Sequence, residues 1–283
     1  MPELPEVETV RTGLAPVLTG ARLARVETGR ADLRFPFPQD FVQALTGARI
    51  EAVDRRAKYL LFRLDRGQTW VTHLGMTGRF LVSGAPLGAF HRDPEMQDRH
   101  THVRIDIEGG ATVGYHDTRR FGFMGLVETA ALSLHPWFAN LGPEPFSAAF
   151  DPVHLQQRVE GRRQPVKGVL LDQRTVAGLG NIYVCEALFR AAIAPDRPAG
   201  DLSKAEIQRL HAEVLEVLQA AISAGGSTLR DFRHSDGALG YFQHRFQVYD
   251  REGEACLRPG CTGQVTRIVQ SGRSSFFCRQ CQA

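Results

Sequence analysis

The chain has 283 residues, of which 43% are hydrophobic and 23% charged, and its formal net charge at pH 7 is +3. This balance is typical of globular proteins and excludes a chain that is disordered throughout. No apolar run approaches the roughly 18 residues of a membrane span. The early acidic residues Glu3, Glu6 and Glu8 argue against a signal peptide. The length favours about two domains, and the charge permits an anionic partner without requiring one.

The first half of the chain is predicted to combine one helix with many strands. Pro5 suits the first turn of a helix over residues 5–18, because that position needs no backbone donor. From about residue 22 to residue 128, short β-like runs alternate with turn residues, which indicates a β-sandwich or barrel. The polar stretch 83–99 is predicted to be a long exposed loop. The clearest strand candidates are Tyr59–Leu64, Thr69–Leu74, His102–Ile107 and Thr112–His116.

The second half is predicted to be helical up to a cysteine-rich end. Pro143 and Pro145 indicate an interdomain linker. Ser203 and Glu206 form the pattern of a capping box, which predicts the start of a long helix. Shorter helices are expected at about 151–160, 167–176 and 181–192.

The last 28 residues hold four of the five cysteines, in two close pairs. Four thiolates in this arrangement make a tetrahedral site that suits Zn²⁺, and a small hairpin without its own core needs such a metal. Gln264–Gln270 and Ser274–Phe277 are expected to pair as its strands, with Arg273 at the tip, where it can meet a phosphate. The predicted ligands are Cys256, Cys261, Cys278 and Cys281.

The amino terminus allows two interpretations. Removal of Met1 would expose the secondary amine of Pro2, and α-amino groups with an ordinary pKa of about 7.7–8.0 are partly neutral at pH 7. Such an amine attacks an aldehyde-level carbon and forms a cationic iminium, while Glu3 and Glu6 beside it can move protons. Alternatively, the prolines begin a helix and the carboxylates stabilise its dipole.

Several motifs in order closely resemble those of the bacterial formamidopyrimidine-DNA glycosylase family. The first is MPELPEVET at the amino terminus, and the last is the cysteine hairpin. Between them lie RRAKYLL (55–61), HLGMTG (73–78), DTRRFG (117–122), LGPEP (141–145), GLGNIY (178–183) and SDGALGYF (235–242). The resemblance therefore covers nearly the whole chain.

The resemblance implies an α+β multidomain fold. It implies an N-terminal catalytic β-sandwich with flanking helices (1–135), a linker (136–150), a helix-two-turn-helix DNA-binding domain with a lesion loop (151–245) and a zinc β-hairpin (246–283). The implied activity is that of a bifunctional DNA glycosylase/AP lyase of base excision repair. Such an enzyme removes 8-oxoguanine and formamidopyrimidines through a Schiff base at its N-terminal proline, followed by β,δ-elimination. The implied partner is double-stranded DNA with oxidised purines or abasic sites. The resemblance also implies a monomer with one structural zinc, located at the nucleoid in the bacterial cytoplasm.

The resemblance also implies roles for individual residues. Pro2 is the nucleophile, Glu3 the general acid/base that opens the deoxyribose, and Glu6 supports the same site. Lys58 holds a phosphate close to the extruded nucleotide, and Arg273 binds phosphate from the zinc hairpin. The implied DNA contacts are His73, Met76, Arg119, Arg120, Phe121, Lys167, Asn181 and Tyr241, with Met76, Arg119 and Phe121 filling the space that the extruded base leaves.

Three alternatives stay open, and one motif departs from the family. An endonuclease VIII-like glycosylase for oxidised pyrimidines has the same prolyl nucleophile, a non-catalytic zinc-containing protein can bind damaged DNA, and a zinc ribbon can serve as an adaptor for proteins. Family members usually have two residues between the first two zinc cysteines, whereas four residues separate Cys256 from Cys261 here. The longer knuckle removes no ligand but can alter the orientation of Arg273.

Overall fold

The computed structural model describes residues 1–84, 99–227 and 240–283. By their contacts, residues form two compact units, one of Met1–Ala139 with Ala224–Tyr241 and one of Asn140–Ser223 with Phe242–Ala283. None of the helices in the described ranges combines the length and apolar character that crossing a membrane requires. The four-part division expected from the sequence stays a prediction, because units of contact and functional domains need not coincide.

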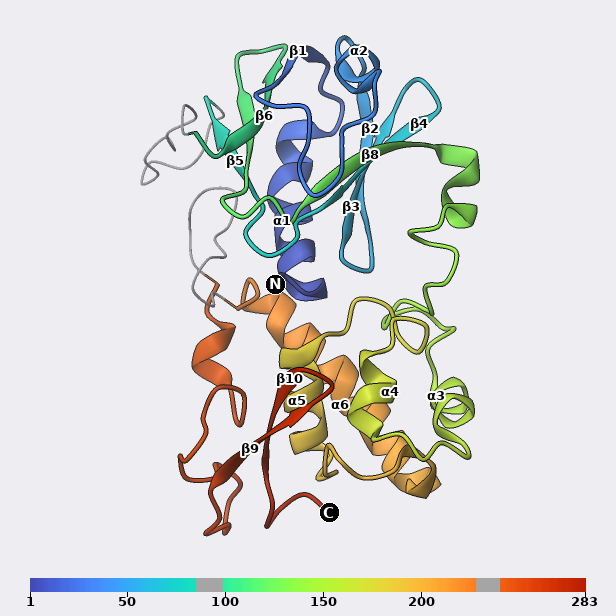
Figure 1. Cartoon of the computed structure of the whole chain (residues 1–283), viewed down its shortest axis with the longest axis vertical. Helices are drawn as coiled ribbons and strands as arrows, with labels where there is room; N and C mark the ends of the chain where they lie inside the picture. Colours follow the sequence, from blue (N-terminus) through green and yellow to red (C-terminus); the bar gives the residue numbers. More distant parts are fainter. Residues whose placement is uncertain (85–98, 228–239) are drawn as a thin grey trace. The chain divides into compact units, whose positions relative to one another are not determined.

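The first unit is built around a β-sandwich of two four-stranded antiparallel sheets (Figure 1). One sheet has the order β1-β6-β7-β5 and consists of β1 (Leu23–Thr28), β6 (Thr101–Ile107), β7 (Thr112–His116) and β5 (Arg79–Ser83). The other has the order β2-β3-β4-β8 and consists of β2 (Ile50–Arg56), β3 (Tyr59–Leu64), β4 (Gln68–His73) and β8 (Phe123–Glu128).

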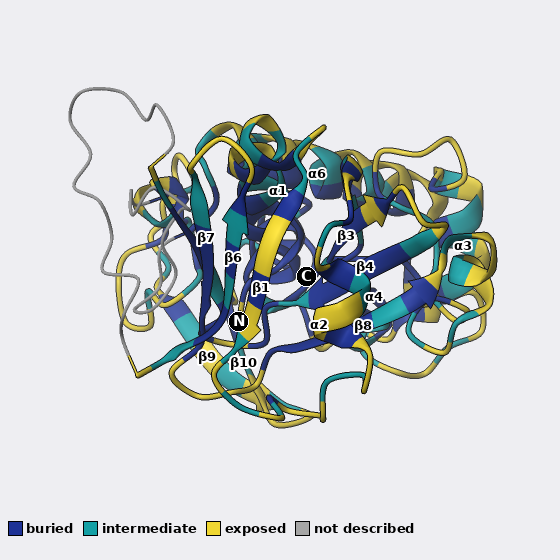
Figure 2. Cartoon of the chain, turned by 90° about the horizontal axis from the view of Figure 1, so that it is seen from above, coloured by how far each residue is buried: buried dark blue, intermediate teal, exposed yellow. Residues whose placement is uncertain are grey.

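Aromatic side chains from both sheets meet in the core of the sandwich. Trp70 of β4 stacks on Phe62 of β3 with ring centroids 4.2 Å apart, and it meets Phe80 of β5 edge to face at 6.0 Å. All three rings are almost completely buried. Exposed residues lie on α2 (Phe41–Leu45) and along the middle of β1 (Figure 2). The 3₁₀-helix η1 (Thr129–Leu134) follows the last strand of the sandwich.

The first helix, α1 (Leu4–Leu18), adds one apolar face to this core. Val7, Val10 and Leu14 recur at helical spacing and are buried. Pro5 stands in the first turn, where its missing N–H leaves no bond unmade. Hydrophobic packing thus fixes the helix against the sandwich, and its N-terminal end is held at one end of the unit (Figure 1).

The second unit packs four helices and a two-stranded hairpin. The helices are α3 (Pro152–Val159), α4 (Val166–Leu171), α5 (Asn181–Arg190) and α6 (Lys204–Ser223), with short 3₁₀-helices η2 (Ala199–Asp201) and η3 (Phe242–Arg245). The capping box at the start of α6 is confirmed, because Glu206 Oε2 accepts from Ser203 N at 2.8 Å and Ser203 Oγ accepts from Glu206 N at 3.3 Å. α4 ends before the predicted residue 176, because the backbone becomes extended at Asp172. The Asp172 carboxylate there accepts a hydrogen bond from the Arg174 amide.

The hairpin pairs β9 (Val265–Gln270) with β10 (Arg273–Cys278). Ser271 and Gly272 form its two-residue turn, both with positive φ (48° and 74°). This conformation matches the twist of paired strands. Arg273 is therefore the first residue after the turn, opposite Gln270, and it is exposed.

The predicted architecture is confirmed in its main parts: a β-sandwich, a helical domain and a cysteine hairpin. The short α2 was not predicted, because five residues carry too little periodicity to indicate a helix. The predicted exposed loop over 83–99 lies mostly outside the described residues. So does most of the segment Ser227–Tyr241, where the family resemblance implies the lesion loop.

Candidate active site

The N-terminal end of α1 brings together the residues predicted to carry the chemistry. Pro2, Glu3 and Glu6 are buried, whereas Met1 is exposed. Glu3 is the N-cap of the helix, and its backbone N–H donates to Glu6 Oε2 at 2.8 Å as half of a capping box. The two carboxylates are thus held beside Pro2 by the way in which the helix begins.

Glu6 also fastens a distant segment of the first unit. Its Oε1 accepts from the Ser227 amide at 2.8 Å and from the Ser227 hydroxyl at 3.0 Å. Gly226 approaches so closely, with φ +74°, that an added Cβ would lie 3.0 Å from the same oxygen. A single buried carboxylate therefore links the start of α1 to the chain that precedes residues 228–239, and sequence reasoning did not find Ser227 as its partner.

Lys58 lies in the tight turn between β2 and β3. Ala57 takes a left-handed conformation there (φ 52°), and the Lys58 side chain is 8% exposed. Neighbouring Arg55 donates to Glu8 Oε2 on α1 at 2.9 Å. This ion pair holds the turn alongside the first turns of α1, at the end of the unit where the chain begins (Figure 1).

His73 ends β4 and is neutral at pH 7. Burial, together with the positive charges of Lys58 and Arg34, lowers the pKa of His73 to about 4. Its Nδ1 accepts from the Gly75 amide at 3.0 Å, so the ring proton stands on Nε2. The ring stacks on Phe123 with centroids 5.0 Å apart. His73 is therefore a fixed neutral donor.

Two loops of the sandwich meet and present apolar side chains. A Cβ on Gly75 would overlap the backbone of Phe121 and Gly122, so the loop after β4 lies directly on the loop before β8. Met76 on one loop is 37% exposed, and Phe121 on the other is 43% exposed. The Arg119 guanidinium lies over the Phe121 ring at 4.7 Å. The structure thus brings the predicted trio together on one surface, which we call the wedge (Met76, Arg119 and Phe121).

Asp117 organises the wedge, and sequence reasoning missed it. Its buried carboxylate accepts from the Thr77 hydroxyl on the first loop and from the amides of Arg119 (3.3 Å) and Gly122 (2.8 Å) on the second. Tyr115 donates to the same carboxylate at 3.5 Å, and burial together with this charge raises the pKa of Tyr115. The signal in the sequence that could have identified Asp117 was its place at the start of the DTRRFG motif.

Arg120 and Tyr241 are placed at the surface of the first unit. Arg120 is exposed and adopts a left-handed conformation, with φ 58°. Tyr241 is 66% exposed, and its amide donates to Ala224 O at 3.1 Å, which brings the two sides of residues 225–240 together.

In the second unit, two predicted DNA-binding residues converge on one carbonyl, next to a third, Arg273. Lys167 Nζ donates to Ser274 O at 2.8 Å and to Ser275 Oγ at 2.6 Å. Asn181, the first residue of α5, donates from Nδ2 to Ser274 O at 3.0 Å. Ser274 follows Arg273, so Lys167 and Asn181 hold the residue next to the exposed arginine. Lys167 is only 1% exposed, and a direct contact between its ammonium and phosphate stays a prediction.

The four predicted zinc ligands lie within 4.8 Å of one another. Cys256 Sγ is 3.7 Å from Cys281 Sγ, and Cys261 Sγ is 3.7 Å from Cys278 Sγ. Tetrahedral zinc with Zn–S bonds of about 2.3 Å separates its sulfur atoms by about 3.75 Å. The donor set therefore fits one structural Zn²⁺, whose chemistry here is to tie the two ends of the hairpin together.

Two further contacts fix the hairpin to α5. The buried Glu186 carboxylate accepts from the amides of Val248 (3.0 Å) and Tyr249 (2.9 Å), while burial raises the pKa of Glu186. Arg258 donates to Phe189 O at 2.5 Å and covers the Phe189 ring at 5.1 Å. Arg258 belongs to the longer knuckle, so the inserted residues provide a cap for the C-terminal end of α5.

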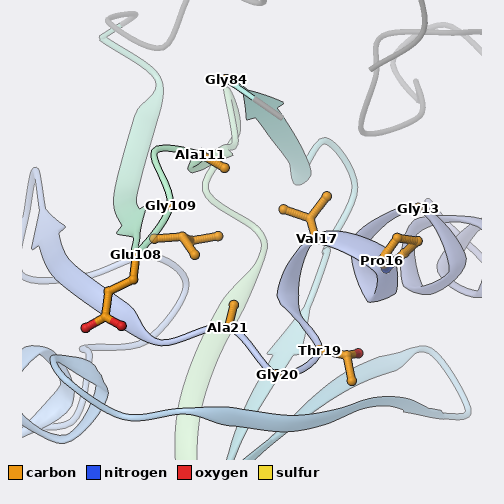
Figure 3. A pocket seen from close by; sticks show the side chains of 11 residues that line it. Gly13, Pro16, Val17, Thr19, Gly20, Ala21, Gly84, Glu108, Gly109 and Ala111 are labelled. Carbon is orange, nitrogen blue, oxygen red and sulfur yellow. The ribbon is translucent and has the colours of Figure 1, made fainter. Parts of the chain in front are cut away.

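A pocket of about 550 Å³ lies elsewhere in the first unit (Figure 3). Val17 and Gly20 at the C-terminal end of α1 line it, together with Glu108 and Gly109 of the β6–β7 turn. The pocket lies at the C-terminal end of α1, whereas Pro2 precedes the N-terminal end. A helix of this length separates its two ends by about 22 Å. None of the candidate site residues lines this pocket, so it is separate from the site described above.

Comparison with known proteins agrees with this geometry. The model of the formamidopyrimidine-DNA glycosylase N-terminal domain matches residues 1–124, and the model of its H2TH domain matches residues 141–233. The chain belongs to the formamidopyrimidine-DNA glycosylase family. Within this family, it is 59% identical over 286 residues to the formamidopyrimidine-DNA glycosylase of Phenylobacterium zucineum and 58% identical over 287 residues to that of Caulobacter vibrioides, with all of each chain covered.

Solved structures of the family are also similar to this chain. The MutM (Fpg) protein of Thermus thermophilus is 42% identical with a TM-score of 0.85, covering 99% of this chain and 98% of that one. A Lactococcus lactis Fpg variant in complex with DNA containing Fapy-dG is 32% identical with a TM-score of 0.88, covering 99% of both chains. L. lactis Fpg in complex with DNA containing an abasic site is 31% identical with a TM-score of 0.87, covering 100% of both chains.

Proposed function

We propose that this chain is a bifunctional DNA glycosylase/AP lyase of base excision repair that removes 8-oxoguanine and formamidopyrimidines. The observation that carries the proposal is the buried N-terminal end of α1, where Glu3 and Glu6 are joined by a 2.8 Å hydrogen bond directly beside Pro2. Family membership supports the substrate class, because relatives of the chain are named for formamidopyrimidine-DNA and one is solved with Fapy-dG in its DNA.

The chemistry begins at the Pro2 nitrogen once Met1 has been removed. This nitrogen bonds to C1′ of the damaged nucleoside and loses its proton, while the base leaves with the electrons of the glycosidic bond and takes up a proton. Glu3 protonates the ring oxygen as the sugar opens, which leaves an iminium on Pro2. Since a secondary amine has no second proton to lose, the iminium stays cationic and acidifies the adjacent carbon. When the adjacent carbon loses its proton, the 3′ phosphate is expelled. A second elimination then expels the 5′ phosphate.

Attack at C1′ requires the nucleotide to leave the stacked duplex. Unstacking costs a few kcal/mol, and apolar side chains inserted at a base step offset part of it. Met76 and Phe121 are exposed side chains of this kind on adjoining loops. Arg119, ordered over the Phe121 ring, contacts the orphaned base.

Phosphate contacts hold the duplex without reading its sequence. We assign them to Lys58, to neutral His73 through Nε2–H, to Arg120, and to Arg273 supported by Asn181 and Lys167 through Ser274 O. Tyr241 belongs to the segment that closes over the damaged base. Zinc, held by the four cysteines, keeps the hairpin that carries Arg273 folded. The protein acts as a monomer on the nucleoid in the bacterial cytoplasm.

Borohydride trapping followed by peptide mapping tests the proposal. With a duplex containing 8-oxoguanine, the wild-type protein is expected to give a covalent adduct at Pro2, and Pro2→Gly or retention of Met1 is expected to suppress it. An adduct on a lysine refutes the assignment, and binding without any adduct indicates a non-catalytic damaged-DNA-binding protein.

The lesion class is tested in parallel. Duplexes with 8-oxoguanine and with thymine glycol are incised by the same preparation, and faster incision of 8-oxoguanine is expected. Faster cutting of thymine glycol would instead indicate an endonuclease VIII-like enzyme.

A further inference from the structure

Seven arginines of the first unit have a carboxylate partner. Such ion pairs neutralise Arg11, Arg22, Arg25, Arg30, Arg55, Arg63 and Arg104. In the described part of this unit, six exposed arginines have no carboxylate partner: Arg34, Arg49, Arg66, Arg99, Arg119 and Arg120. Two of these six, Arg119 and Arg120, belong to the loop before β8. Of the others, Arg34 contacts that loop through its backbone amide.

Arg34 lies beside the same loop, although it is far from it in sequence. Its amide donates to Gly122 O at 3.0 Å, one residue after Phe121. The next residue, Phe35, meets Phe123 edge to face at 5.3 Å, and Phe123 stacks on His73. The charge of Arg34 also contributes to the lowered pKa of His73, so the guanidinium is within electrostatic reach of that ring. Residues 33–35 thus form a third loop next to the two loops of the wedge.

This third loop presents its side chains to solvent in a defined arrangement. Leu33 is 7% exposed and anchors the loop, while Phe35 is 47% exposed. The Arg34 guanidinium lies over the Phe35 ring, 5.6 Å from its centroid. An aromatic face orders a cation in this way without neutralising it. The result is an ordered and uncompensated positive charge at the edge of the predicted DNA surface.

We propose that Arg34, held by Phe35, binds a backbone phosphate next to the base step that the wedge enters. This inference rests on the proposed function, because it takes the duplex to lie over Met76 and Phe121. The chemistry is that of a planar guanidinium with several donors, which matches phosphate oxygens. No sequence preference follows from such a contact, which suits an enzyme that acts on damage in any sequence context.

The salt dependence of DNA binding tests this contact. Each neutralised phosphate contributes about 0.9 to the slope of log affinity against log salt concentration. Between 50 and 200 mM salt, the wild-type protein is therefore expected to lose about 3.5-fold more affinity than Arg34→Gln. Binding is measured on a duplex with a tetrahydrofuran abasic site, which cannot be excised. Arg34→Lys is expected to keep the wild-type slope, because its ammonium neutralises the same phosphate.

Arg25→Gln is the matched control. Arg25 is an exposed arginine paired with Glu27 on β1, and its replacement changes the net charge by the same amount. It is expected to leave the slope unchanged. A wild-type slope in Arg34→Gln, an equal decrease in Arg25→Gln, or a decrease in Arg34→Lys as large as in Arg34→Gln would each overturn the proposal.

Trapping separates this proposal from the proposed function. Arg34→Gln at saturating protein is expected to give the same borohydride adduct on 8-oxoguanine DNA as the wild type, since Arg34 does not contact Pro2. Absence of an adduct from the wild-type protein refutes the catalytic assignment. The binding slopes then still decide whether Arg34 contacts phosphate.

Discussion

Replacing Glu6 by glutamine changes one acceptor oxygen into a donor at the junction between α1 and Ser227. Among the described residues, the carboxylate accepts hydrogen bonds from Glu3 N (2.8 Å), Ser227 N (2.8 Å) and Ser227 Oγ (3.0 Å). The amide of glutamine has only one oxygen. If that oxygen faces Ser227, the new NH₂ group faces the Glu3 N–H, and a buried donor loses its partner.

The structure sets the size of this effect. One hydrogen bond to a charged group contributes about 1.5–3 kcal/mol, and the two remaining bonds weaken when their acceptor becomes neutral. We expect a total loss of about 3 kcal/mol, which corresponds to a decrease in Tm of roughly 6–12 °C for a unit of this size. Ser227→Ala removes only the hydroxyl bond and is expected to destabilise by about 1 kcal/mol.

Thermal unfolding followed by circular dichroism measures both variants, and single-turnover excision of 8-oxoguanine measures the function. Glu6→Gln is expected to slow excision more than it weakens DNA binding, because the Glu3 backbone loses its anchor beside Pro2. A Glu6→Gln protein that melts within about 2 °C of the wild type would refute the reasoning, as would a Ser227→Ala protein that is equally destabilised.

Three other predictions concern the remaining parts of the site. The folded-state pKa of His73 is about 4 against 6.5 when unfolded, so stability present above pH 6.5 is lost as the pH falls toward 4. We expect the free energy of unfolding, measured in urea, to fall between pH 7 and pH 4.5 by about 2–3 kcal/mol less in His73→Gln than in the wild type. Equal decreases in the two proteins would contradict a buried neutral ring. Asp117→Asn turns a donor toward groups that are themselves donors and is expected to destabilise by about 2 kcal/mol. Asp117→Asn should also reduce the fluorescence change of a 2-aminopurine placed opposite an abasic site when the protein binds the DNA. An unchanged signal would show that the wedge is formed without Asp117. Cys278→Ser is expected to lose zinc and DNA binding together, as measured by metal analysis and fluorescence anisotropy, whereas full incision by a zinc-free variant would contradict this dependence.

Local patterns in the sequence were sufficient for most elements and for the metal. The strand at Tyr59–Leu64 is found at its predicted bounds, and the helix predicted over 5–18 is α1. Both are signalled by side chains only a few positions apart, which is the range over which periodicity and capping act. Cysteine spacing identified the zinc site for the same reason, because the close pairs already bring most of the ligands together.

The partners of the charged groups were decided by the tertiary structure alone. Three hydrogen bonds join residues that lie far apart in the chain: Glu6 with Ser227, Lys167 with Ser274, and Arg34 with the Gly122 backbone. No periodic pattern encodes such contacts, since they depend on how the sheets and helices pack. Motif resemblance placed the wedge residues in one site, but only the folded chain reveals that buried Asp117 holds them and that Arg34 stands beside them without a counter-charge.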